Sequence, residues 1–132
     1  MKRLRVKTTS RIEMIDITSE VQRLVSEEGI NEGICLVYCP HTTAGVVINE
    51  HADPSVAEDI ASALTEQYPH RRAWRHLEGN ADAHVKSAVV GISAMIPITG
   101  GRLALGTWQG IFFCEFDGPR SRELYVQIMS SE

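Results

Sequence analysis

Cysteine is scarce in this chain of 132 residues, with three copies at Cys35, Cys39 and Cys114. An odd number of cysteines in a chain without a predicted secretory segment favours free thiols. If Cys35 and Cys39 lie on one strand, their Cα atoms are about 13 Å apart, whereas disulfide-bonded Cα atoms lie within about 7 Å. A disulfide scaffold and thiol catalysis are therefore not expected.

Long apolar runs and an excess of positive charge are also absent. No segment has about 18 consecutive apolar residues, and no apolar stretch of the signal-peptide kind follows the basic start of the chain. The formal net charge is −4, which gives little support to binding of nucleic acid or anionic lipid. Walker loops, dinucleotide fingerprints and nucleophile elbows are missing too. We expect a cytoplasmic protein with neither nucleic-acid nor membrane partners.

The composition is that of one globular domain, with 43% hydrophobic and 23% charged residues. Short alternating or apolar segments between polar turns predict strands, and the glycine turns in the last third of the chain favour antiparallel pairing. We predict a single α+β domain over residues 1–132 with mostly antiparallel sheet. The predicted strands are 4–8, 11–17, 33–39, 44–49, 94–98, 103–105, 109–116 and 124–129, of which the first two are expected to form a hairpin.

Three helices are predicted from capping residues and from the spacing of apolar residues. A capping side chain accepts hydrogen bonds from the first turn, proline is tolerated at the first helical position, and glycine commonly follows the last turn. The helices are 18–29, with Thr18 as its cap and Gly29 as its end; 53–68, starting at Asp53 and Pro54; and a third that starts at the cap Asn80, with Val85 and Val89 as its apolar stripe. Residues 70–79 are predicted to be a loop.

A dense polar block, residues 75–84, is the strongest indication of a functional site. Unpaired backbone amides at the start of the third helix create a small positive potential where an anion could bind. His76 and Glu78 precede this turn, and His84 follows it. With His41 from the other half of the chain, three neutral imidazoles and an open position would suit Zn²⁺, and carboxylates such as Glu50 or Asp53 could enlarge the site or suit Mg²⁺. The alternative is that each imidazole is a hydrogen-bonding loop or capping side chain.

Two later segments add further polar groups. Residues 106–110 place Trp108 between two strands, where its ring could form the floor of a pocket or cover the edge of the core. Glu115 and Asp117 are predicted to lie on the same side of a strand, which is costly unless a cation balances them. Arg120, in a turn of glycine and proline, can hold a phosphate through two parallel hydrogen bonds.

These segments give the chain a resemblance to the YjbQ family, small proteins described as secondary thiamine-phosphate synthases. The resemblance implies a β-sandwich-like core and a homotrimer whose polar blocks gather near a subunit boundary. It also implies a weak capacity to join hydroxymethylpyrimidine diphosphate to a thiazole phosphate with release of pyrophosphate. The matching blocks, which together span nearly the whole chain, are 41–45, 49–54, 75–84, 93–111 and 115–120.

Displacement of pyrophosphate requires charge neutralisation more than covalent chemistry, so these residues are compatible with that reaction. Trp108 would stack on a heterocycle, the helix start and Arg120 would hold phosphate, and the histidines would bind a divalent metal, Zn²⁺ or Mg²⁺, or transfer protons. The candidate catalytic residues are His41, His76, Glu78, His84 and Glu115, and the three histidines are also the candidate metal ligands. The candidate binding residues for a phosphorylated small molecule are Thr42, Thr43, Asn80, Thr107, Trp108, Gln109, Asp117 and Arg120.

Two other functions stay open on the same residues. One is a metal-dependent hydrolase of a phosphate or similar ester, in which a metal-bound water attacks the substrate. The other is a trimer that binds a small molecule or a metal without catalysis. Phosphatase turnover well above synthase turnover would favour the first, and ligand binding without turnover would favour the second.

Overall fold

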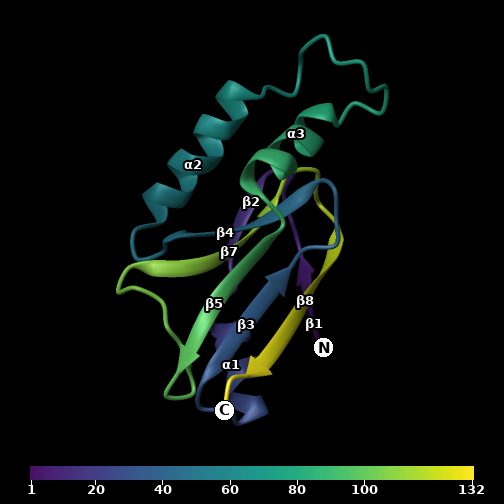
Figure 1. Cartoon of the computed structure of the whole chain (residues 1–132). Helices are drawn as coiled ribbons and strands as arrows, with labels where there is room; N and C mark the ends of the chain where they lie inside the picture. Colours follow the sequence, from purple (N-terminus) through teal and green to yellow (C-terminus); the bar gives the residue numbers. More distant parts are fainter.

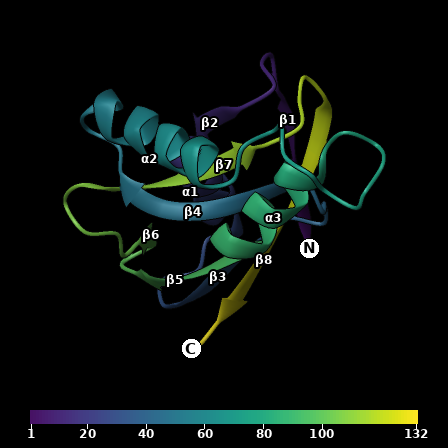
Figure 2. The same cartoon turned by 90° about the horizontal axis from the view of Figure 1, so that it is seen from above.

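The computed structural model describes all 132 residues, which form two antiparallel sheets and three helices (Figures 1 and 2). The strand order is β1-β8-β3-β5-β6 in the larger sheet and β2-β7-β4 in the smaller one. The predicted α+β fold is confirmed. The strands are β1 (Lys2–Lys7), β2 (Glu13–Asp16), β3 (Gly33–Tyr38), β4 (Ala44–Glu50), β5 (Ser93–Thr99), β6 (Arg102–Leu103), β7 (Gln109–Glu115) and β8 (Ser121–Ser130), and the helices are α1 (Thr18–Glu28), α2 (Pro54–Gln67) and α3 (Ala81–Val90).

The main core lies between the two sheets and α1. Val37 and Val126 of the larger sheet, Phe113 of the smaller sheet and Val21 of α1 are all fully or almost fully buried there. Phe112 points to the other face of β7, where α2 and α3 cover the smaller sheet. The smaller sheet is therefore enclosed on both faces, which explains why β7 is a continuous apolar run rather than an alternating one.

The predicted N-terminal hairpin is wrong. β1 pairs with β8 and β2 pairs with β7, so the first two strands lie in different sheets. The segment between them is held by the turn before β8, because Thr8 N donates to Arg120 O and Gly118 N donates to Arg11 O, both at 2.9 Å. Gly118 packs so closely that a Cβ would collide with Ser10 O. These partners come from the far end of the chain, and the local turn pattern could not indicate them.

Two of the predicted helix boundaries are confirmed. Asp53 caps α2, since its Oδ1 accepts a hydrogen bond of 3.0 Å from Ser55 N. Gly29 follows α1 with a φ of 70°, a left-handed conformation that glycine adopts without strain. Thr18, in contrast, is the first residue of α1 and not its cap; its hydroxyl donates to Asp16 and accepts from Ile111 N at 2.9 Å. It ties α1 to β7.

The predicted apolar stripe of α3 is also wrong. Val89 is 55% exposed and Val85 is only half-buried. Asn80 precedes the helix as predicted, but its side chain makes no capping hydrogen bond. The buried face of α3 instead combines small and charged residues: Ala81, Asp82, Ala83, Lys86 and Ser87.

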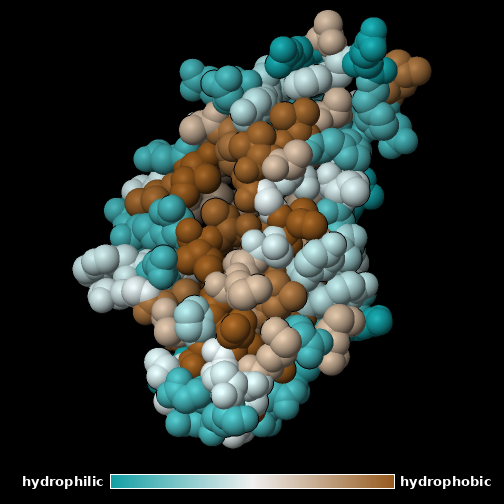
Figure 3. All heavy atoms as spheres, in the orientation of Figure 1, coloured by the Kyte–Doolittle hydropathy of each residue, from teal (hydrophilic) through white to brown (hydrophobic).

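The outer face of the larger sheet is unusually apolar. Ile34, Tyr38, Met95 and Met129, from β3, β5 and β8, are each at least 36% exposed. Figure 3 shows hydrophobic side chains gathered in a band on the face of the molecule where β5 and β3 lie. None of the helices has the length and apolar character needed to cross a membrane. The three cysteines are free and buried, as predicted.

Candidate functional site

A polar pocket of about 330 Å³ forms where the segment after β3, the start of α3 and the turn between β7 and β8 meet. Three parts of the chain that are far apart in sequence supply it, so most of the candidate site residues are brought together. No hydrophobic side chain lines it. Its lining residues are Pro40, His41, Thr42, Thr43, Glu78, Asn80, His84, Asp117, Arg120 and Arg122.

Arg122 is the most firmly held cation of this polar pocket. Its side chain is 6% exposed, and its Nε donates to Glu115 Oε1 at 2.8 Å. Its Nη2 donates to the other oxygen of Glu115 and, at 2.9 Å, to Thr43 Oγ1. Sequence reasoning missed Arg122, although a signal existed: it occupies the same face of β8 as the buried Leu124 and Val126, where an arginine is unexpected.

Each carboxylate of the predicted pair, Glu115 and Asp117, has its own arginine, so the expected charge balance is present. Asp117 Oδ2 accepts hydrogen bonds of 2.9 Å from both Arg120 Nη2 and Asn80 Nδ2. Burial alone would raise the pKa of both carboxyl groups, but the hydrogen bonds to Glu115 from Arg122 and to Asp117 from Asn80 and Arg120 outweigh it. Both pKa values lie below their ordinary ranges, and both groups are ionised at neutral pH.

Arg120 and Asn80 are arranged differently from the expectation for phosphate binding. Arg120 uses Nε and Nη2 for the backbone and side-chain oxygens of Asp117, so only Nη1 lacks a partner in the chain. A phosphate would therefore meet one nitrogen of Arg120 rather than a parallel pair. The Asn80 amide is turned toward Asp117, and its Oδ1 is buried without a hydrogen-bond partner.

Of the three candidate histidines, His41 and His84 line the polar pocket and His76 does not. His84 lines the polar pocket with His41, and its ring meets the His76 ring edge to face, with centroids 5.2 Å apart. His41 Nε2 lies 3.1 Å from Glu123 N and 3.0 Å from Glu123 O. Burial and the nearby Arg122 lower the pKa of His41, so it is neutral at pH 7. No group of three or more His, Cys, Asp or Glu side chains is arranged to hold a metal, and the three-histidine ligand set stays a prediction.

The loop at residues 106–110 does not contribute to the polar pocket. Thr107 and Gln109 line a separate cavity of about 640 Å³ beside α1. Gln109 Oε1 accepts from Gly106 N at 2.8 Å and so closes its own turn, while Trp108 is 62% exposed. Trp108 lines neither this cavity nor the polar pocket, so within a single chain it does not form the floor of a pocket.

The arrangement can hold an anion next to a neutral base. Arg122 Nη1 forms no hydrogen bond within the chain and is not fully buried, and Arg122 lines the polar pocket. The position of Nη1 is fixed because Nε and Nη2 of the same guanidinium are hydrogen-bonded to Glu115 and Thr43. A phosphate oxygen bound there would lie in the same pocket as the imidazoles of His41 and His84.

Comparisons of the whole chain agree with this fold. A family model described as UPF0047 protein YjbQ-like matches residues 2–131. The chain is 55% identical to UPF0047 protein YugU of Bacillus subtilis, over 98% of each chain. It is 52% identical to UPF0047 protein MJ1081 of Methanocaldococcus jannaschii, over 96% of this chain and 92% of that protein.

Solved structures give the same result. The crystal structure of an uncharacterised YjbQ/UPF0047 family protein from Clostridium acetobutylicum superposes with a TM-score of 0.96 at 46% identity, covering 98% of this chain and 100% of that one. A YbjQ-like protein of unknown function from Sulfolobus solfataricus has a TM-score of 0.95 at 38% identity, covering 98% and 96%. The chain belongs to the YjbQ/UPF0047 family.

Proposed function

We propose that the protein is a transferase similar to thiamine-phosphate synthase, with weak turnover, and that its phosphorylated substrate binds in the polar pocket. It would join hydroxymethylpyrimidine diphosphate to a thiazole phosphate and release pyrophosphate. The observation that carries the proposal is the nearly buried Arg122, which lines the pocket and whose Nη1 has no hydrogen-bond partner in the chain. The free, buried cysteines support the cytoplasm as the proposed location.

A fixed guanidinium is well suited to this chemistry. When pyrophosphate leaves, the bond between the methylene carbon and the ester oxygen breaks and negative charge grows on that oxygen, which preorganised donors stabilise without having to reorient. Arg122 is held by Glu115 and Thr43, and Arg120 is held by Asp117. The neutral His41 exchanges a proton with the substrate in this proposal, and the His84 imidazole lines the same pocket.

A divalent metal is part of the proposal, and the oxygen-rich lining favours Mg²⁺ over Zn²⁺. Mg²⁺ is commonly bound by one or two carboxylates together with substrate phosphates, so it does not need a preformed protein cage. Glu78 and Asp117 would hold it, because Glu50 and Asp53 do not line this pocket. The bound Mg²⁺ would neutralise part of the negative charge of the substrate phosphates. Zn²⁺ would instead bind His41 through Nδ1, because Nε2 lies against the Glu123 backbone.

Replacing His84 or Arg120 by alanine is expected to reduce synthase turnover by at least about 100-fold, because each removes a group aimed at the reacting phosphate. Arg120 is half exposed, so the fold should survive its loss. Pyrophosphate release from the two substrates measures the rate, and thermal melting measures folding. Arg102→Ala is the matched control, since Arg102 lines only the cavity beside α1.

Unchanged turnover in both pocket variants would contradict the proposed roles. If phosphate esters are hydrolysed much faster than the synthase substrates are joined, the metal-dependent hydrolase becomes the better assignment. If ligands raise the melting temperature but no substrate is turned over, the protein is a binding trimer without catalysis.

We also propose a homotrimer that buries the apolar outer face of the larger sheet. Exposed apolar patches of this kind commonly mark contacts between chains. Sedimentation is expected to give about three times the chain mass of 14.6 kDa, and Met95→Lys should shift it toward the monomer, since Met95 is 63% exposed on that face. Gln67→Lys, on α2, adds the same charge away from the sheet and should leave the mass unchanged. A wild-type monomer would contradict this proposal.

A further inference from the structure

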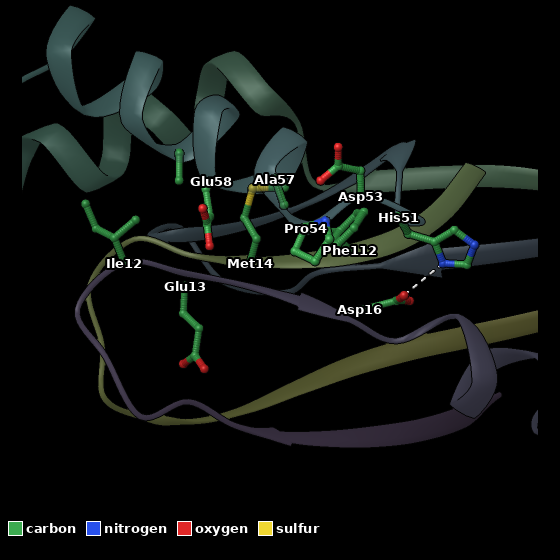
Figure 4. A pocket seen from close by; sticks show the side chains of 11 residues that line it. Ile12, Glu13, Met14, Asp16, His51, Asp53, Pro54, Ala57, Glu58 and Phe112 are labelled. Carbon is green, nitrogen blue, oxygen red and sulfur yellow. Dashed lines mark hydrogen bonds and ion pairs between the residues drawn. The ribbon is translucent and has the colours of Figure 1, made fainter. Parts of the chain in front are cut away.

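A second pocket lies under α2, between that helix and strands β2 and β7 (Figure 4). Its volume is about 410 Å³, and it shares no lining residue with the polar pocket. Ile12, Met14 and Phe112 form one apolar side, and Ala57 and Ala61 of α2 form the other. This α2 pocket is therefore a slot with apolar walls, open at the protein surface.

The fold leaves the underside of α2 only partly covered. The helix starts with a well-formed cap, yet none of its residues is fully buried. Ala57 and Ala61 are half-buried above the slot. Burial of apolar surface stabilises a protein by roughly 25 cal/mol per Å², so an occupant with an apolar body would gain energy by filling this space.

Glu58 is the one charged group of the α2 pocket that the fold leaves without a partner. Figure 4 shows its side chain reaching from α2 toward Ile12 and Met14, and it makes no hydrogen bond or ion pair within the chain. The other acidic side chains are engaged. Glu13 accepts from Thr9 N at 2.8 Å, Asp53 caps α2, and Asp16 Oδ2 lies 2.8 Å from His51 Nδ1.

No lysine or arginine lines this slot. We infer that the α2 pocket binds a small organic cation with an apolar body, of the alkylammonium or arylammonium class. The nitrogen pairs with Glu58, and the apolar body packs between Met14, Phe112 and the two alanines of α2. The inference is independent of the proposed function, because the two pockets have no residue in common.

Binding of the 2-phenylethylammonium ion, measured by calorimetry and by NMR shift changes, tests this inference. The matched ligands are 2-phenylethanol, which has the same body without charge, and 3-phenylpropanoate, which carries the opposite charge. The ammonium ion is expected to bind about two- to fivefold more tightly than the alcohol, because Glu58 is exposed and an exposed ion pair adds little affinity. The carboxylate should not bind, and added salt should weaken the ammonium complex.

Two variants locate the complex. Glu58→Gln should lower the affinity for the ammonium ion about two- to fivefold, to that of the alcohol, without changing the affinity for the alcohol. Ala61→Leu should abolish binding of both by filling the slot. Glu66→Gln removes the same charge from α2 outside the pocket and should have no effect. Equal affinities for the ammonium ion and the alcohol, an unaffected Glu58→Gln variant, or no ammonium binding would each overturn the inference. If Ala61→Leu fails to fold, the difference in ammonium affinity between the wild type and Glu58→Gln still tests the inference.

Discussion

Replacement of Asp82 by asparagine is expected to lower the free energy of unfolding by about 3–5 kcal/mol, a large share of a small domain's stability. The Asp82 side chain is fully buried and accepts hydrogen bonds from Arg11 Nη2 at 3.0 Å and from Lys86 Nζ at 2.9 Å. Lys86 is also fully buried and has no other hydrogen-bond partner. Without the carboxylate, its ammonium group stays in the core uncompensated. Urea unfolding at pH 7 measures the loss.

The double variant Asp82→Leu with Lys86→Met separates the cost of an unpaired charge from the cost of losing the pair. Replacing a buried ion pair by apolar side chains of similar volume is often neutral or stabilising, so the double variant should regain most of the lost stability. Arg11, which is 30% exposed, can turn to solvent. Arg23→Gln breaks the exposed pair with Glu27 and should cost less than about 0.5 kcal/mol. A double variant as unstable as Asp82→Asn would show that the pair itself stabilises the fold.

Features of the fold that depend on neighbouring residues could be predicted from the sequence. The cap at Asp53 and the end of α1 at Gly29 are set by backbone groups within the same turn. The pairing of β1 with β8 depends instead on residues more than 100 positions apart, such as Thr8 and Arg120. Local patterns carry no information on such pairs, and the hairpin prediction failed for this reason.

The same distinction applies to the candidate site. The polar block and His41 were expected to converge, and Glu78, Asn80 and His84 line one pocket with His41, whereas His76 lies outside it. The buried charges of α3 were not predictable, because Asp82 and Lys86 have the spacing of an ordinary surface ion pair. Their burial follows from the packing of α3 against β4, far away in sequence, and Arg11 pairs with Asp82. The opposite holds for Trp108. Its aromatic side chain suggested a pocket, but in the structure it is exposed.

Replacement of Arg122 by methionine is expected to cost about 3–5 kcal/mol at pH 7, and the cost should shrink in acid. In the wild type, hydrogen bonds from Arg122, the Asp117 amide and Thr8 outweigh the effect of burial and lower the pKa of Glu115. Glu115 therefore binds a proton more readily in the unfolded chain than in the folded one. The stabilisation of the fold by the ionised Glu115 is complete above about pH 4.5. It is lost as the pH falls through the lowered pKa.

In the Arg122→Met variant the burial of Glu115 is no longer offset by a guanidinium, so the carboxyl group should stay protonated to higher pH. The stability difference from the wild type, measured by urea unfolding between about pH 7 and pH 2.5, should therefore narrow as Glu115 becomes neutral in both proteins. Arg120→Met is the matched control, because Arg120 is 51% exposed and its pair with Asp117 should contribute less than about 1 kcal/mol. A difference that stays constant over this pH range would mean that Arg122 acts through packing and not through the charge of Glu115, and its role as a fixed anion-binding group would then lack support.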